Sequence, residues 1–169
     1  FDFKKLQNLS SKHIAAASNA ALLQNITNYQ SANGATPFTD AQLQRLDTAM
    51  YCLKERAKTL PELLEKARFI LQTRPISIDE PAQATLDSVF IGILQSLTPQ
   101  LQNATWCREH LEVLFHEFVG SNGIKFGQLA APLRAALAGR KATPSVYDMM
   151  VLLGRDETIA RIRDAIAES

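Results

Sequence analysis

Apolar residues recur along most of the chain at the spacing of an α-helix. The clearest example is the series Leu86, Val89, Phe90, Ile93, Leu94 and Leu97. Because these positions are separated by three or four residues, they share one side of a helix and leave polar residues on the other. Similar series within 43–57, 60–71 and 111–118 predict further helices.

Residues that cap helices stand at the start of several of these series. Thr39 precedes one of them, and Thr59 with Glu62 forms the Thr-x-x-Glu pattern of a capping box. Thr143 followed by Pro144 predicts another N-cap, with proline at the first helical position. These signals support helices that begin at defined residues.

The end of the chain predicts three more helices. We expect them over 125–138, closed by Gly139, over 144–153, closed by Gly154, and over 156–167. Short apolar runs that would suit strands fall within helical spacing elsewhere. The sequence therefore predicts an all-α protein of roughly eight to ten short helices.

A domain boundary is predicted between 73 and 80, where Pro75 and Pro81 interrupt two strong helical patterns. Splitting the chain there gives two small helical bundles, residues 1–75 and 76–169. Each bundle is small, so we expect the two to pack against each other.

Composition narrows the class of protein without identifying it. The 169 residues are 46% hydrophobic and 21% charged, which is typical of a soluble globular protein, and no apolar run could span a membrane. Cys52 and Cys107 form no CxxC pair, which favours a reducing compartment and so the cytoplasm. The chain begins at Phe1 without a leader pattern, so we expect it to be part of a longer polypeptide.

No pattern in the chain predicts catalysis or metal binding. The phosphate-binding, zinc-protease and nucleophile-elbow motifs are absent from the sequence. Cys107, His110 and His116 suggest a metal, but His116 falls on another side of the helix and a fourth ligand is lacking. We interpret them as a core cysteine and two surface histidines, and predict no catalytic residue and no metal site.

The distribution of charge is more informative than the net charge of +1. Between Glu117 and Asp148 the sequence holds no acid, yet it holds four cations: Lys125, Arg134, Arg140 and Lys141. A second basic cluster lies at 54–58. Unpaired cations are common on helix surfaces, so solvated side chains are one interpretation. The other is a surface that binds a polyanion.

The segment 124–154 carries a more specific signal. Its sequence IKFGQLAAPLRAALAGRKATPSVYDMMVLLG resembles the carboxy-terminal signature of bacterial glutamyl-tRNA synthetases. Residues 1–6, 64–69 and 159–163 also fit that family, so the resemblance covers essentially the whole chain. It departs at Asn8, Ser10 and His13, where the family usually has other residues that join this region to the catalytic half.

The resemblance implies an all-helical anticodon-binding region of two bundles, which binds the anticodon loop of glutamate tRNA. It also implies that the protein is a monomer. The half that would use ATP and Mg to attach glutamate is missing from these residues. The RNA-binding residues that the resemblance implies are Arg56, Arg134, Thr143, Pro144 and Val146, with Gln128 and Lys125 as weaker neighbours. Lys141, a cation of the segment without acids, is predicted to contact a phosphate. Arg56 would read the third anticodon base, so Arg56→Ala should weaken discrimination more than overall affinity.

Two alternatives to this function remain open at this stage. One is a helical protein-interaction module, and the other is a divergent synthetase paralogue without an aminoacylation role. DNA binding through a helix-turn-helix at 125–153 is disfavoured, because the second helix carries Asp148 among mostly apolar residues.

Overall fold

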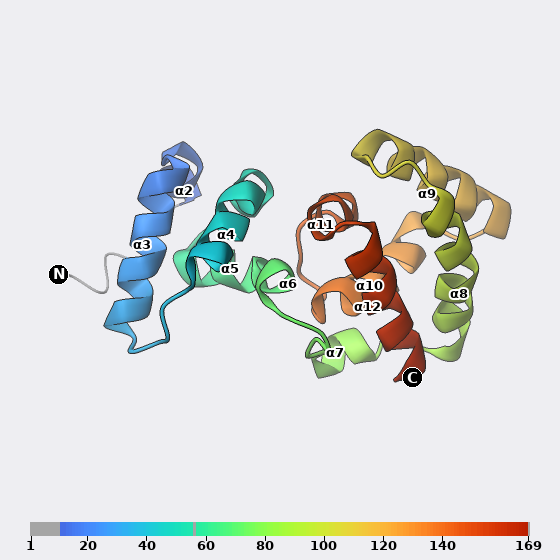
Figure 1. The fold of residues 1–169 in the computed structure, drawn as a ribbon. Coiled ribbons are helices and arrows are strands. Elements are labelled where there is room, and N and C mark those ends of the chain that lie inside the picture. Colours follow the sequence, from blue (N-terminus) through green and yellow to red (C-terminus); the bar gives the residue numbers. More distant parts are fainter. Residues whose placement is uncertain (1–10, 56, 169) are drawn as a thin grey trace. The chain divides into compact units, whose positions relative to one another are not determined.

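A computed structural model describes residues 11–55 and 57–168, and every regular element in this part of the chain is an α-helix (Figure 1). The prediction of an all-α protein is confirmed. The described residues form eleven helices, more than predicted, because α6 (Arg68–Leu71) and α7 (Glu80–Gln83) are only four residues long. No helix among the described residues is both long and apolar enough to cross a membrane.

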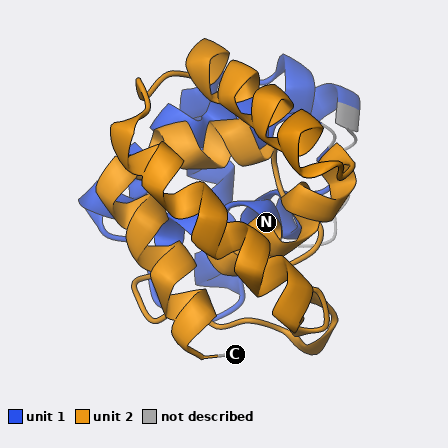
Figure 2. Cartoon of the chain, turned by 90° about the vertical axis from the view of Figure 1, so that its right-hand side faces the viewer, with its two compact units in different colours: residues 1–71 blue, residues 72–169 orange. Residues whose placement is uncertain are grey.

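The chain divides between Leu71 and Gln72 into two compact units, which have separate colours in Figure 2. This division lies at the start of the connection between α6 and α7. The predicted boundary, between residues 75 and 76, falls within the same connection. Each unit has its own buried core and is described by itself.

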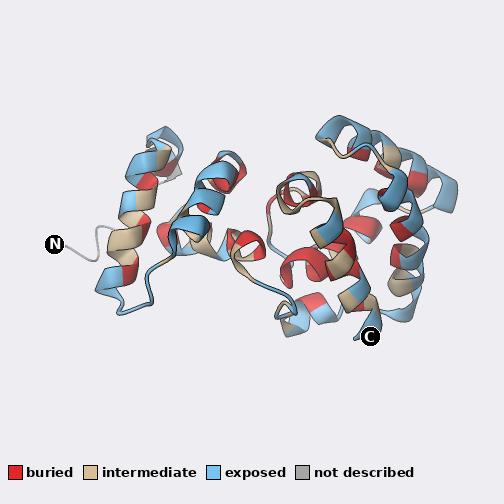
Figure 3. Cartoon of the chain, viewed as in Figure 1, coloured by how far each residue is buried: buried red, intermediate tan, exposed pale blue. Residues whose placement is uncertain are grey.

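The first unit is a bundle in which α4 packs against α3 and α6, and α5 packs against α6. Its helices are α2 (Ser11–Ala16), α3 (Asn19–Ala32), α4 (Asp40–Leu53), α5 (Leu60–Lys66) and α6. The fully buried residues include Leu22, Ile26, Leu46, Met50 and Leu53. Figure 3 colours the buried positions of each helix red. Leu46, Met50 and Leu53 belong to the apolar series predicted within 43–57. Leu22 and Ile26 lie on α3, for which no apolar series was predicted.

The predicted N-caps of α4 and α5 are present, although the second is only half of a capping box. Thr39 accepts a hydrogen bond from the Gln42 amide, and the Gln42 side chain accepts one from the Thr39 amide. Thr59 likewise accepts from the Glu62 amide. The Glu62 carboxylate, however, accepts from the amide of Lys58 (3.0 Å) instead of closing the box on Thr59.

The second unit is built around α10, which packs against five other helices. Its helices are α7, α8 (Ser88–Asn103), α9 (Arg108–Asn122), α10 (Phe126–Ala138), α11 (Val146–Leu153) and α12 (Arg155–Ala167). The buried residues of α10 are Leu129, Ala130, Pro132, Leu133, Ala135, Ala136, Leu137 and Ala138. Half of these are alanines, whose small side chains let neighbouring helices approach closely.

Burial along α8 differs from the predicted stripe at its first turn. Leu94 and Leu97 are buried as predicted, but Val89 is 66% exposed. The helix continues through Pro99 and buries Leu101 as well. The side chains that pack against α10 and α12 therefore lie later in α8 than the sequence pattern indicates.

Two glycines end helices in the left-handed conformation, and the end at Gly139 was predicted. Gly123 (φ +62°) closes α9 and Gly139 (φ +69°) closes α10. At Gly139 a Cβ atom would lie 1.9 Å from the backbone oxygen of Ser77, so only glycine fits. The Asp79 amide also donates to the Gly139 carbonyl, which fixes the connection before α7 against the end of α10.

The start of α11 corrects one prediction. The helix begins at Val146 with Ser145 as its N-cap, so Thr143 is not a capping residue and Pro144 is not the first helical residue. The hydroxyl of Thr143 donates to the carbonyl of Pro144 (2.8 Å). It also accepts a hydrogen bond from Arg134, so its oxygen is engaged before the helix begins.

Candidate nucleic-acid interface

Arg134 is the central cation of the candidate interface. It lies on α10, is half-buried, and donates from Nε to Oγ1 of Thr143 over 3.2 Å. No described carboxylate forms an ion pair with it. The bond at Nε orients the guanidinium, and no described residue accepts a hydrogen bond from its other two nitrogens.

The electrostatic state of Arg134 makes it suited to a polar ligand. Burial lowers the pKa of Arg134, because a partly desolvated cation is less stable than one in water. A guanidinium nevertheless stays protonated near neutral pH. Arg134 is therefore a partly desolvated positive charge without a compensating acid, which favours a ligand that offers oxygen or nitrogen acceptors.

Three of the predicted residues lie at the start of α11 or just before it, and the side chains of two of them are buried. Of the three, Thr143 is the one that is bonded to Arg134. Thr143 is partly exposed, Pro144 is buried, and Val146 is only 1% exposed. Contact between Pro144 or Val146 and a ligand would therefore rely on backbone atoms. The Val146 amide, at the start of α11, is a suitable donor for such a contact. Proline has no backbone N–H, so Pro144 could offer only its carbonyl oxygen as an acceptor.

Lys125 and Gln128 lie at the start of α10. The Lys125 amide donates to Oε1 of Gln128 (2.8 Å), so the Gln128 side chain helps to start the helix. Both residues are exposed. Lys125 and Arg134 are nine positions apart, which corresponds to about 14 Å along a helix. The structure therefore brings Arg134 together with Thr143 but not with this pair.

The segment between Glu117 and Asp148 contains no acid, but an acid from another part of the chain lies next to it. Arg140 lies 3.5 Å from a carboxylate oxygen of Asp79 and donates to the carbonyls of Ser77 and Gly139. The close approach at Gly139 brings Asp79 next to it. Arg140 is thus a structural residue, whereas Lys141 is exposed and forms no ion pair with the described part of the chain.

The second basic cluster, at 54–58, is only partly described. Arg56 lies outside the described residues, so its implied role stays a prediction. Lys54 donates from Nζ to the carbonyl of Ala17 (2.7 Å) and therefore stabilises the first unit. Lys58 is exposed.

An ion pair between an exposed arginine and a buried carboxylate positions α11, and the sequence did not predict it. Arg108 on α9 donates to the carboxylate of Asp148 (2.6 Å), whose side chain is only 10% exposed. This bond raises the pKa of Arg108, because the carboxylate stabilises its charge. Asp148 is therefore not an exposed acid on a recognition helix, and it fixes the first turn of α11 against α9.

Arg161 is a second structural cation that the sequence did not reveal. It is 3% exposed, donates to the carbonyls of Leu137 and Gln72, and pairs with Glu157 at 2.8 Å. The i, i+4 spacing of Glu157 and Arg161 predicts their ion pair. The spacing does not predict that Arg161 is buried. Its burial depends on the backbone carbonyl of Leu137, near the end of α10, which accepts a hydrogen bond from it.

Cys107 differs from the predicted core cysteine. It is the half-buried N-cap residue of α9, and its Sγ lies 2.9 Å from Nδ1 of the exposed His110. The thiol lies outside the core because it precedes the first turn of the helix. In residues 11–55 and 57–168, no three His, Cys, Asp or Glu side chains are grouped as metal ligands.

Comparisons with known proteins identify the family of the chain. Residues 12–166 match the model of the anticodon binding domain, so the chain belongs to this family. It is 60% identical over 165 residues to glutamate–tRNA ligase 2 of Ruegeria pomeroyi. It is 54% identical over 166 residues to glutamate–tRNA ligase 1 of Cereibacter sphaeroides (strain ATCC 17029).

These relatives are longer proteins. Each alignment covers 98% of this chain but only 35% of the relative, so the chain spans about a third of their length. The fold also matches the crystal structure of a glutamate tRNA ligase from Elizabethkingia meningosepticum with a TM-score of 0.71 and 25% identity. That match covers 94% of this chain and 31% of the other. The comparisons do not favour a protein-interaction module as the main function.

Proposed function

We propose that the chain binds tRNA, and that its target is the anticodon loop of glutamate tRNA. The observation that carries this proposal is the half-buried Arg134, which has no acid partner in the described residues and is oriented by Thr143. A positioned guanidinium suits the edge or face of an unstacked base, which is how proteins read single-stranded RNA loops.

The remaining predicted residues take two roles in this proposal. Exposed Lys141, seven residues beyond Arg134 in the sequence, contacts a phosphate and contributes affinity without base selectivity. Lys125 and Gln128 contact the RNA at the start of α10, or they serve only to begin that helix. Arg56 reads the third anticodon base, as the resemblance implies.

We further propose that the chain is the RNA-binding part of a glutamate–tRNA ligase that acts as a monomer in the cytoplasm. Cys52 and Cys107 are not joined in a disulfide, which is compatible with a reducing compartment. Attachment of glutamate, with ATP and Mg, is assigned to a part of such a protein outside these 169 residues. This assignment follows the lengths of the relatives.

The experiment that tests this proposal is a band-shift comparison of two RNAs with the 169-residue chain. One is glutamate tRNA, and the other is the same tRNA with its anticodon replaced. The proposal predicts tighter binding of the unaltered tRNA, with about 1–3 kcal/mol of discrimination for each base that is read by a good hydrogen-bonded contact. Equal affinities would refute recognition of the anticodon.

A further inference from the structure

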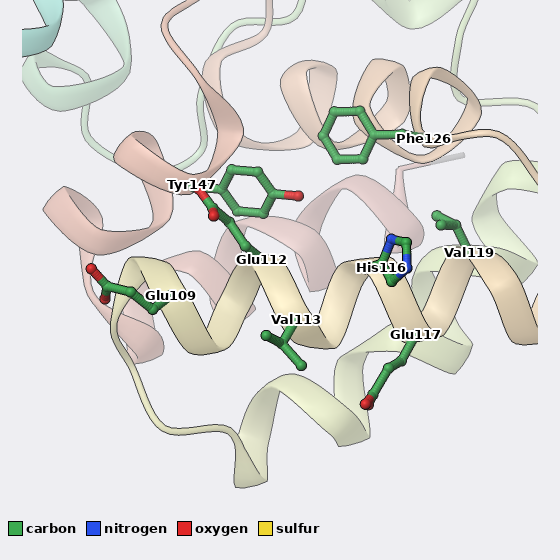
Figure 4. Close-up of a pocket in the computed structure, with 8 residues that line it drawn as sticks. All are labelled: Glu109, Glu112, Val113, His116, Glu117, Val119, Phe126 and Tyr147. Carbon is green, nitrogen blue, oxygen red and sulfur yellow. The ribbon is translucent and has the colours of Figure 1, made fainter.

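An open groove in the second unit lies outside the residues proposed to bind RNA. It has a volume of about 750 Å³, and Figure 4 shows its lining along α9. The lining residues are Glu109, Glu112, Val113, His116, Glu117, Val119, Phe126 and Tyr147. Those from α9 recur at helical spacing, so no helix of the described residues covers this long face of α9.

The floor of the groove is apolar and aromatic. Phe126 and Tyr147 stack with ring centroids 5.8 Å apart and planes at 24°. Phe126 is 40% exposed and Val113 is 57% exposed. Large apolar side chains gathered in one exposed concavity are typical of a binding surface.

The rim of the groove is acidic. Glu109 and Glu117 lie near opposite ends of the lining in Figure 4, and neither forms an ion pair with a described residue. Glu112 lies between them along the helix and pairs with Arg108. Three carboxylates along one helix face repel the phosphates of RNA and attract a cation.

The aromatic floor already accepts a cation on one side. The guanidinium of Arg108 lies 5.7 Å from the ring centroid of Tyr147. Such contacts are attractive because the face of an aromatic ring is electronegative. The exposed ring of Phe126 offers a similar surface to a lysine or arginine that enters from solvent.

We infer that this groove docks a basic amphipathic segment of a partner protein, with apolar side chains on Phe126 and Val113 and lysine or arginine side chains on the glutamate rim. The charge complementarity selects this occupant over RNA. Tyr147 is the second residue of α11, so the docked segment contacts α11. This is the helix that follows the loop containing Thr143.

The test uses the 169-residue chain and a fluorescein-labelled helical peptide with leucines on one face and lysines on the other. Fluorescence anisotropy measures its affinity for the chain, and a peptide with glutamates in place of the lysines measures the contribution of charge. We expect the basic peptide to bind with an affinity that falls as salt is added. The acidic peptide should bind far more weakly.

Variants assign the binding to the groove. Glu109→Gln combined with Glu117→Gln should weaken the basic peptide about fivefold, because two ion pairs at an exposed rim are lost. The matched control is Asp47→Asn combined with Glu168→Gln, which removes two exposed acids elsewhere. Val113→Ala should also weaken the peptide, whereas Val89→Ala, at another exposed valine, should not. Circular dichroism confirms that each variant is folded.

Several results would overturn this inference. Equal binding of the acidic peptide, or groove variants that bind like their controls, would exclude the site. If glutamate tRNA displaces the peptide and loses affinity in the same groove variants, the groove belongs to RNA. If the chain self-associates and the Glu109→Gln, Glu117→Gln variant abolishes this, a second copy is the occupant.

Discussion

Arg134 and Thr143 are joined by a hydrogen bond of 3.2 Å from Nε to Oγ1, although they are nine positions apart in the sequence. The bond links the middle of α10 to the loop that precedes α11. It holds one edge of the guanidinium, so the other edge is presented in a defined direction. The proposed function depends on this relationship more than on the number of cations in the chain.

Lys141 should contribute affinity without selectivity. Because it is exposed and without an acid partner among the described residues, Lys141→Ala should weaken the binding of all tRNAs similarly. The slope of log affinity against log salt should become shallower by about 1, since one phosphate contact is lost. The measurement is a filter-binding titration at several salt concentrations, with Arg163→Ala in α12 as the control. An unchanged slope would exclude a phosphate contact at Lys141.

The ion pair between Arg108 and Asp148 should stabilise the second unit. Removing the buried carboxylate in Asp148→Ala leaves Arg108 with its exposed partner only, and we expect a loss of about 2 kcal/mol in the free energy of unfolding. Glu112→Gln removes the other, exposed carboxylate from the same arginine and should cost less than about 1 kcal/mol. Urea unfolding of both variants measures the difference. Similar losses would show that the burial of Asp148 has no energetic weight.

The pair of Arg74 and Asp164 predicts how stability depends on pH. Two hydrogen bonds from Arg74 hold the pKa of Asp164 below its usual range. The unfolded chain therefore binds this proton more tightly than the folded chain does. The stabilisation is complete above the usual carboxyl pKa of about 4 and is lost as pH falls through the lower folded value.

Asp164→Asn isolates this contribution. The variant should unfold at lower urea than the unaltered chain near neutral pH, and the two midpoints should converge in acid. Arg74→Met should behave in the same way, because it removes the other partner of the pair. A difference in midpoints that does not change with pH would contradict the assignment.

The helices were largely predictable because their signals are local. Apolar spacing, the cap at Thr39 and the glycines that end α9 and α10 each act within a few residues, so the sequence alone reveals them. The start of α11 was predicted too early because Thr143 bonds to Arg134 from another helix. A threonine before an apolar series suggests an N-cap, but the sequence does not show which donor or acceptor its hydroxyl bonds to in the fold.

The candidate site was predictable in its residue types but not in its electrostatics. In the sequence, Arg134 and Arg140 are both arginines in a segment without acids. Of the two, Arg140 is the one that forms an ion pair in the structure, with Asp79. This pair forms because Gly139 allows the backbone of Ser77 to pack closely against it. Asp148 looks like a surface acid but is buried against Arg108. Such pairings arise between distant segments, so they emerge only with the fold.

The central claim is that Arg134 reads a base of the anticodon, and one thermodynamic cycle tests it most directly. The unaltered chain and Arg134→Ala are each titrated with glutamate tRNA and with the tRNA whose anticodon has been replaced, and Arg163→Ala serves as the control. We predict that Arg134→Ala loses about 1–3 kcal/mol of binding free energy with the unaltered tRNA and little with the replaced anticodon. Equal losses with both tRNAs would contradict the claim.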